Sequence, residues 1–202
     1  AAIPSQLLQE SLQKAIDKFY NMISVDTDTS TSDMVVMFST GEHKFNLTET
    51  NNMESFQSLL DDACIDLAKQ IILDGEGATK LIEVSVKGAA NDSDARKVAK
   101  SIIDSPLVKT AIYGEDPNWG RVLMAAGKSD VKFNQDKLEL MFGDYLIFSK
   151  GDLMEYNRSD VVSELKKDTV RIRLNLNLNK GVAIAWGCDL THKYVDINTE
   201  YN

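Results

Sequence analysis

Polar side chains gather in four short segments of this sequence, and their carboxylates, amides and hydroxyls are the groups most able to bind a substrate. An ionised carboxylate accepts strong hydrogen bonds from an ammonium group, and an amide both donates and accepts. Each segment is a candidate binding loop, although each alone also fits a turn capped by its own side chains. The segments are VDTDTSTSD at 25–33, DGEGATK at 74–80, GEDPNWGR at 114–121, and WGCDL at 186–190 followed by YVDIN at 194–198.

The segment GEDPNWGR has the most constrained backbone of the four, because it contains one of only three prolines together with two glycines. Asp116 is predicted to cap a helix that begins at Pro117 and ends at Gly127. The free N–H groups at the start of such a helix favour an anion, which makes Asn118 and Arg121 candidates for contact with a substrate carboxylate. A structural turn with a well-placed cap explains the same residues, and for Asn118 and Arg121 we prefer that reading.

Other candidate sites have weaker support. The run 25–33 lacks the glycine and the distal glutamate of a calcium loop, so hydrogen-bonded turns are expected there and no metal site is predicted. Cys64 and Cys188 have no second cysteine or histidine at ligand spacing, which predicts buried, reduced thiols. The alternative to a buried, unreactive thiol at Cys188 is a catalytic nucleophile. Lys80 and Lys109 are predicted to be solvated, as most lysines are.

Helices and strands alternate along the chain and must position these segments. Apolar residues at helical spacing predict helices at 7–19, 56–72, 92–104 and 159–166. The apolar run at 105–113 is β-like, and MVVMF at 34–38 is typical of a buried strand. Further strands are predicted at 81–86 and, in the second half, in KFNQDKLELMF, DYLIF, TVRIRLNLNL and VAIAW, the last two joined by a hairpin turn at 179–181.

Composition limits the classes of protein to which the chain can belong. Its 202 residues are enough for a substantial core, and we expect one compact unit over residues 1–202. A formal charge of -9 repels phosphate backbones, which argues against nucleic acid as a partner. No apolar run approaches the ~20 residues that a membrane span needs, and the first residues do not form a secretory signal. We therefore expect a cytoplasmic protein without a membrane partner.

Taken together, in their order and spacing, the four segments resemble those in the β chain of ornithine acetyltransferase, the glutamate N-acetyltransferase of the arginine biosynthesis bifunctional protein family. The resemblance extends over essentially all 202 residues. It implies an α+β or α/β fold, a layered helix and sheet sandwich of the self-processing, N-terminal-threonine type. It also implies that residues 1–202 form a single β-chain unit completed by a separate α chain, in an α2β2 assembly.

The resemblance further implies an acyltransferase that cuts its own precursor before a threonine. That threonine takes acetyl from N-acetylornithine and passes it to glutamate in a ping-pong reaction, since a free α-amino group can act as the base for its hydroxyl. The family needs no cofactor, although acetyl-CoA is a possible second acetyl donor. Family β chains begin with Thr-Met-Leu, so the nucleophilic threonine is expected just before Ala1 and no catalytic residue is expected within this chain.

Two substrate-binding residues can be carried over from the family by position. Glu76 in DGEGATK matches a glutamate that would accept hydrogen bonds from a substrate ammonium, and Asn198 in YVDIN matches an asparagine that would bind a carboxylate or an amine. Two other functions stay open. One is an aminopeptidase or amidase on the same self-processing fold, in which water resolves the acyl-enzyme; the other is a non-catalytic partner subunit.

Overall fold

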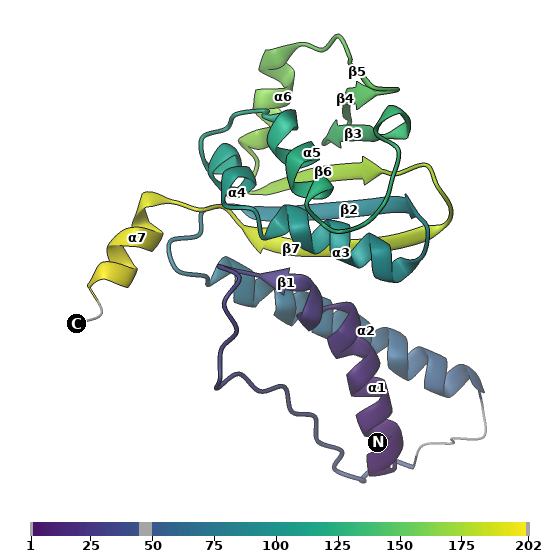
Figure 1. Ribbon diagram of the computed structural model, residues 1–202. Helices are drawn as coiled ribbons and strands as arrows, with labels where there is room; N and C mark the ends of the chain where they lie inside the picture. The colour runs from purple at the N-terminus through teal and green to yellow at the C-terminus, as the bar shows by residue number, and fades with distance from the viewer. Residues whose placement is uncertain (1, 45–49, 201–202) are drawn as a thin grey trace. The chain divides into compact units, whose positions relative to one another are not determined.

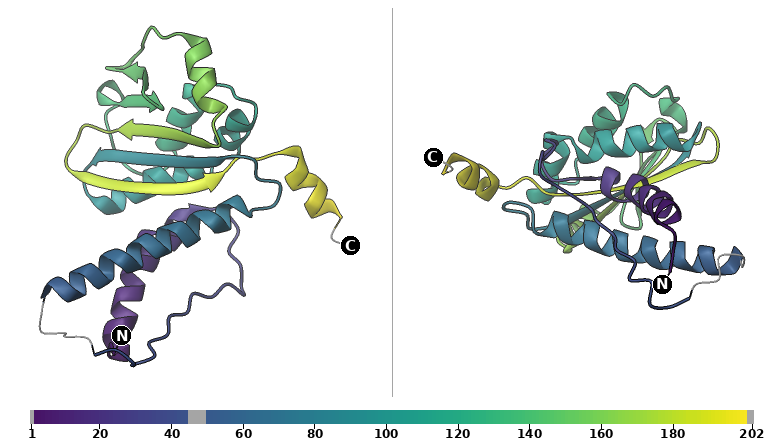
Figure 2. Two further views of the ribbon diagram at one scale, coloured as in Figure 1. Left: turned by 180° about the vertical axis from the view of Figure 1, so that it is seen from behind. Right: turned by 90° about the horizontal axis from the view of Figure 1, so that it is seen from below.

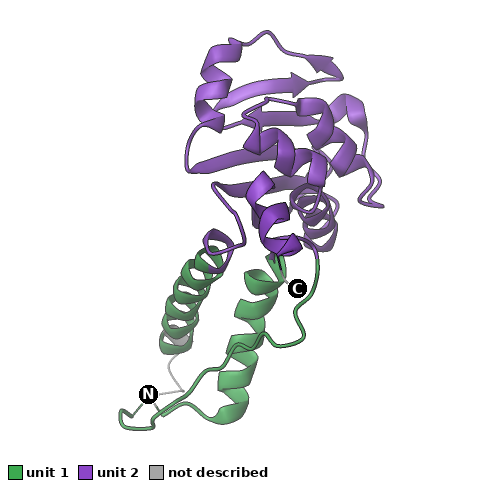
Figure 3. Cartoon of the chain, turned by 90° about the vertical axis from the view of Figure 1, so that its left-hand side faces the viewer, with its two compact units in different colours: residues 1–22, 28–70 green, residues 23–27, 71–202 purple. Residues whose placement is uncertain are grey.

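The computed structural model describes residues 2–44 and 50–200. Its contacts divide the chain into two compact units, which Figure 3 shows in different colours. Unit 1 comprises Ala1–Met22 and Asp28–Gln70, and unit 2 comprises Ile23–Thr27 and Ile71–Asn202. Each unit is described by itself below.

Unit 1 is built on two helices, α1 (Ser5–Lys18) and α2 (Thr50–Leu73). The last three residues of α2, 71–73, belong to unit 2. A short 3-10 turn, η1 (Tyr20–Met22), follows α1. The helices are joined by an ion pair of 2.8 Å between Lys18 and Asp61 and by the Gln57 side chain, which donates to the carbonyl oxygen of Ser11. Both predicted helices are confirmed. The buried apolar residues of the unit are Ile3, Leu12, Ala15, Phe19, Met22, Cys64 and Ala68.

The strand predicted at 34–38 is wrong. These residues form neither helix nor strand, and the side chains of Met34 and Phe38 are 79% and 87% exposed. A strand requires a neighbouring strand with which its backbone can form hydrogen bonds. Within residues 2–44 and 50–200 no segment pairs with this run.

Unit 2 contains a mixed seven-stranded sheet in the order β1-β7-β2-β6-β3-β4-β5 (Figure 1). The pairs β2–β6 and β1–β7 are parallel, and the other neighbours are antiparallel. Both edge strands have only two residues. The strands are β1 (Ile23–Ser24), β2 (Leu81–Ala89), β3 (Glu139–Phe142), β4 (Tyr145–Ser149), β5 (Asp152–Leu153), β6 (Thr169–Asn175) and β7 (Gly181–Cys188).

Helices α3, α4 and α5 gather on one face of this sheet, as Figures 1 and 2 show from the front and from behind. Alternate residues of the strands point towards this layer, so Ile82 and Val84 of β2 and Ile172 of β6 are fully buried. The helices of the unit are α3 (Asp92–Ile103), α4 (Pro106–Tyr113), α5 (Trp119–Gly127), α6 (Arg158–Leu165) and α7 (His192–Thr199).

The predicted hairpin between β6 and β7 is wrong, because β2 lies between these strands. Val84 of β2 faces Ile172 of β6 on one side and Ala185 of β7 on the other. The connection crosses the end of β2, where the Leu178 N–H donates to the carbonyl oxygen of Gly88 at 2.7 Å. The turn residues at 179–181 do not show from the sequence whether β6 and β7 are neighbours, since such residues also occur in a longer connection that passes another strand.

The β-like run at 105–113 is in fact helix α4. Its buried residues, Val108, Ala111 and Ile112, recur at helical rather than alternating spacing. The next helix, α5, starts at Trp119 and not at Pro117, and its N-cap is Asn118 and not Asp116.

The structure bears on two further predictions, the state of the cysteines and the membrane span. Cys64 and Cys188 are both buried free thiols, as predicted. Within the described residues, no helix combines the length and the apolar character that a membrane span requires.

Candidate functional site

The structure brings together the two residues that the sequence analysis singled out for substrate binding. The Asn198 side-chain amide donates to Oε2 of Glu76 at 2.5 Å, across 122 residues of sequence. The same amide nitrogen donates to the carbonyl oxygen of Tyr194 at 2.9 Å, which holds the side chain along α7. Both residues belong to unit 2; Asn198 is exposed and Glu76 is half-buried. Their role in binding stays a prediction.

Glu76 is positioned by a loop whose glycines allow α7 to approach closely. Gly77 has a φ of +70°, and a Cβ at this position would lie 2.6 Å from the backbone nitrogen of Tyr194. The Thr191 hydroxyl donates to the carbonyl oxygen of Gly77 at 2.8 Å. Only glycine allows this conformation and this approach without strain, so the loop sequence fixes the distance between Glu76 and the helix that carries Asn198.

A buried carboxylate holds the other end of the same loop. Asp189 is 3% exposed, and its Oδ1 accepts hydrogen bonds from the backbone N–H groups of Thr79 and Lys80 at 2.8 and 3.0 Å. Its Oδ2 accepts a hydrogen bond from the Thr79 hydroxyl at 2.5 Å. Three donors offset much of the cost of burying the charge. The segment after β7 therefore clamps the Glu76 loop at both Gly77 and Thr79.

The N-terminus of α7 connects this loop to the first polar segment. Thr191 is the N-cap of the helix and accepts a hydrogen bond from the Tyr194 N–H at 3.3 Å. The Tyr194 hydroxyl donates to Oδ2 of Asp26 at 3.1 Å. Three of the four predicted segments therefore meet at α7, and Asp26 serves there as an anchor. The sequence predicts only hydrogen-bonded turns over 25–33 and assigns no role to Asp26.

Lys109 was predicted to be solvated, and this prediction is wrong. The side chain is 2% exposed, and its ammonium group donates to the carbonyl oxygens of Val25 and Cys188, both at 2.6 Å. It also lies 3.7 Å from Sγ of Cys188. Lys109 therefore ties the residue after β1 to the last residue of β7, and Asp26 and Asp189 come directly after these two residues in the sequence. The sequence did not predict this burial, because the run 105–113 is β-like in its pattern and Lys109 lies on the buried face of helix α4.

Lys80 is also largely buried, and its prediction as solvated is wrong as well. Its ammonium group donates to the carbonyl oxygen of Leu165 at 2.8 Å and pairs with Glu115 at 3.2 Å. The side chain is 11% exposed. Lys80 therefore ties the end of the Glu76 loop to α6 and to the segment before α5.

The environment of Cys188 does not activate it as a nucleophile. Burial raises the pKa of its thiol above the ordinary value, and the nearby Lys109 ammonium lowers it by less. A reactive cysteine needs the opposite balance. The structure thus supports a packing role for Cys188, and no histidine contact to its sulfur is found among the described residues.

The segment GEDPNWGR serves folding. Asn118 accepts a hydrogen bond from the Arg121 N–H at 3.3 Å, and the Arg121 guanidinium donates to the carbonyl oxygen of Leu107 at 3.0 Å. Trp119 stacks on Phe148 with 5.6 Å between ring centroids. Asp116 pairs with Arg158 instead of capping the helix. These contacts support the structural reading that we preferred for Asn118 and Arg121.

The described residues contain no group of three histidine, cysteine, aspartate or glutamate side chains that could hold a metal ion. The chemistry of the site as it stands is that of a carboxylate and an amide that accept hydrogen bonds.

A family model described as the ArgJ family matches residues 1–202. The chain belongs to the ArgJ family. A relative from Dehalococcoides mccartyi, named arginine biosynthesis bifunctional protein ArgJ, is 47% identical over all of this chain and half of its own length. The protein of the same name from Geobacillus stearothermophilus is 44% identical, with the same coverage.

The fold is shared with a solved ArgJ family structure. The crystal structure of arginine biosynthesis bifunctional protein argJ from Bacillus halodurans superposes with a TM-score of 0.95 and 44% identity, and the match covers 100% of this chain and 96% of that one. The predicted α+β layered fold is thereby confirmed. This chain spans about half the length of the curated ArgJ relatives, whereas it matches nearly the whole of the solved chain.

Proposed function

We propose that this chain is the β subunit of a glutamate N-acetyltransferase that moves acetyl from N-acetylornithine to glutamate. The observation that carries the proposal is the contact between Glu76 and Asn198 in a chain of the ArgJ family. N-acetylornithine carries an ammonium group at the end of its side chain, and glutamate carries one at its α-carbon. The site offers acceptor oxygens to such a group.

The hydrogen bonds of the site define what it offers. The amide nitrogen of Asn198 already donates to Glu76 and to Tyr194, so the group that it presents to a ligand is its acceptor oxygen. The Glu76 carboxylate adds a negative charge beside it. An ammonium group of ornithine or glutamate fits between these acceptors better than a carboxylate does, because a carboxylate would face Glu76 at close range.

The reaction then follows from a threonine that we place just before Ala1. Its hydroxyl attacks the acetyl carbonyl of N-acetylornithine, the C–N bond breaks, and ornithine leaves with the proton. The amine of glutamate next attacks the acetyl-threonine ester, which releases N-acetylglutamate and restores the hydroxyl. In the first half-reaction the proposed role of this chain is to hold the side-chain ammonium of N-acetylornithine. In the second, Glu76 would bind the ammonium of the incoming glutamate; this group must lose one proton before it attacks and a second to the threonine oxygen as the ester breaks. The proposal requires no cofactor, and acetyl-CoA would be a second acetyl donor.

We further propose that an α chain from the same precursor completes the enzyme, in an α2β2 assembly in the cytoplasm. The lengths of the relatives support a division of the precursor: this chain spans half of the curated proteins but matches 96% of the solved chain from Bacillus halodurans. A precursor cut in two would give chains of this size.

The test is to express the whole gene, weigh the resulting chains by intact-mass spectrometry, and assay acetyl transfer. We expect two chains, with a threonine at the start of the second, and transfer from N-acetylornithine to glutamate. Hydrolysis of N-acetylornithine without transfer would favour the aminopeptidase or amidase. An uncut product without either activity would favour the non-catalytic partner subunit.

A further inference from the structure

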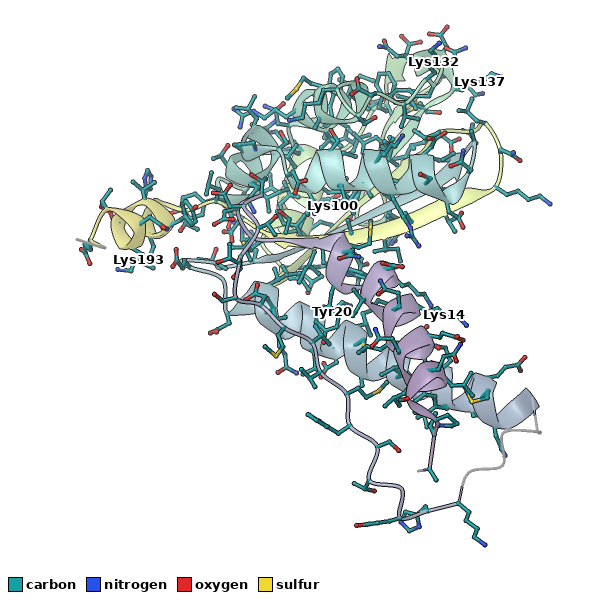
Figure 4. The ribbon with its side chains drawn as sticks, turned by 60° about the horizontal axis from the view of Figure 1, so that its bottom comes forward. Lys14, Tyr20, Lys100, Lys132, Lys137 and Lys193 are labelled. Atoms are coloured by element: carbon teal, nitrogen blue, oxygen red, sulfur yellow. The ribbon has the colours of Figure 1, made fainter. Side chains whose placement is uncertain are left out.

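An apolar segment of unit 1 is exposed to solvent. Residues 34–38, with the sequence MVVMF, carry large hydrophobic side chains, of which Met34, Val36 and Phe38 are 79%, 53% and 87% exposed. Figure 4 shows side chains projecting singly from this extended stretch of chain. Four of these five apolar residues are exposed, and Met37 is half-buried. So many exposed apolar residues within one short run are unusual on a protein surface and mark a site of interaction.

The backbone of the segment is equally available. No hydrogen bond from its N–H or C=O groups to any of residues 2–44 and 50–200 is found. The chain beside it is nevertheless attached: Ser39 accepts a hydrogen bond from the Ile3 N–H at 3.5 Å, and the carbonyl oxygen of His43 accepts one from the Ala2 N–H at 2.7 Å. The segment is therefore held near one end while its own polar groups lack partners from the described chain.

The sequence of the segment fits a strand with both faces covered. Val35 and Val36 are β-branched, and all five residues are apolar instead of alternating with polar ones. A partner must therefore supply a sheet edge for the backbone and apolar surface for the row of Met34, Val36 and Phe38, which is more exposed than the row of Val35 and Met37. Peptide segments bind in this way by adding a strand to an existing sheet.

A second copy of this chain does not meet these requirements. The edges of its sheet are β1 and β5, each two residues long, which is too short for a five-residue strand. Two copies of the segment paired with each other would form a two-stranded ribbon, which is marginal in water and leaves its faces exposed. The curated ArgJ relatives, by contrast, contain as much chain again as this one spans.

We propose that residues 34–38 form a strand at the edge of a sheet in the other half of the ArgJ precursor, and so dock that half onto unit 1. This inference rests on the proposed function, which places that half in a separate α chain. It names the surface through which the α chain is bound and the kind of contact that it makes.

Hydrogen exchange on the two-chain protein tests the proposal directly. All amides of 35–38 are expected to exchange within seconds in this chain alone. In the complex the alternate amides that face the partner strand should exchange at least about 100-fold more slowly. Buried amides of α3 serve as an internal control, since they are protected in both samples. Exchange that stays fast in the complex would overturn the inference, and slow exchange in this chain alone would point to self-association instead.

Variants test the energetics of the same contact. Val36→Pro removes an N–H, and Phe38→Asp places a charge in the covered row, so each is expected to raise the Kd for the α chain at least about tenfold. The matched controls are Val36→Thr, which keeps the N–H and the β-branched shape, and Leu153→Asp, which adds the same charge at the edge strand β5, where Leu153 is 51% exposed. Circular dichroism shows whether each variant is folded.

The outcomes separate this inference from the proposed function. Unchanged affinity in both test variants would overturn the docking surface even if the complex transfers acetyl. A complex that docks through 34–38 but transfers no acetyl would refute the function and leave the docking surface standing.

Discussion

The ammonium group of Lys109 lies 2.6 Å from the carbonyl oxygen of Cys188 and 2.6 Å from that of Val25, in a position that is 2% exposed. One side chain of α4 thus joins the ends of two parallel strands, β1 and β7. The residues that follow these ends, Asp26 and Asp189, are the ones that hold α7 and the Glu76 loop. The segments that carry Glu76 and Asn198 are therefore held in part through a buried cation.

Replacing this cation should destabilise unit 2. Lys109→Met keeps the aliphatic stem but leaves two carbonyl oxygens without their donor, at a cost of about 1–3 kcal/mol for each group, partly offset because a charge no longer has to be buried. We expect a net loss of about 2 kcal/mol in the free energy of unfolding, measured in urea. Lys132→Met, at an exposed position labelled in Figure 4, is the control and should change it by less than about 0.5 kcal/mol.

Adding a methyl group to the Glu76 loop should separate it from α7. In Gly77→Ala the new Cβ would lie 2.6 Å from the Tyr194 nitrogen and 2.9 Å from Oγ1 of Thr191, in a backbone conformation that alanine disfavours. We expect at least about 1 kcal/mol of destabilisation and a higher KM in the assembled enzyme.

Gly127→Ala is the matched control, because nothing lies within 4 Å of its Cβ and its φ is not positive. This change should be neutral or slightly stabilising. Equal effects of the two substitutions would argue that the approach of α7 to the loop is not specific.

Neutralising Glu76 should weaken the binding of the substrate and leave the fold intact. Glu76→Gln keeps an oxygen that can accept from Asn198 but removes the charge that a substrate ammonium would meet. We expect KM for N-acetylornithine or glutamate to rise about tenfold, with an unchanged urea midpoint. Glu155→Gln, at an exposed position, controls for the loss of a negative charge; kinetics identical in both variants would remove Glu76 from the site.

The buried thiol of Cys188 should make stability depend on alkaline pH. Burial raises its pKa in the folded state above the ordinary value of 9.0, so the folded state holds the proton more tightly than the unfolded state does. This contribution to stability is complete below the unfolded pKa and disappears as pH rises through the folded pKa. The free energy of unfolding, measured in urea, should therefore decrease less between pH 8 and 11 in Cys188→Ala than in the wild type. The two curves are compared after their difference at pH 7 has been subtracted. Parallel curves would show that the thiol does not titrate in this range.

The sequence was sufficient to predict the parts of the fold in which a single segment determines its own structure. The apolar stripe of α2 and the alternation in β6 depend on local periodicity, and both elements are where they were predicted. Family resemblance identified Glu76 and Asn198, and the structure shows that they meet.

The features that were missed depend on distant parts of the chain. The separation of β6 from β7 requires β2 between them, and the roles of Lys109 and Asp189 require strand ends that lie far apart in sequence. The run 34–38 was predicted as a strand from its composition, yet composition cannot supply the neighbouring strand. Local pattern predicts the tendency of a segment, and only the assembled chain decides whether that tendency is satisfied.

The pairing of Glu76 with Asn198 also sets an order of events during synthesis. A ribosome adds the asparagine 122 residues after the glutamate, a delay of roughly 6 to 24 seconds at ordinary elongation rates. During that interval the glutamate loop has emerged without the threonine cap and the aspartate that later restrain it. The pairing of Glu76 with Asn198 can therefore form only when translation of unit 2 is almost finished.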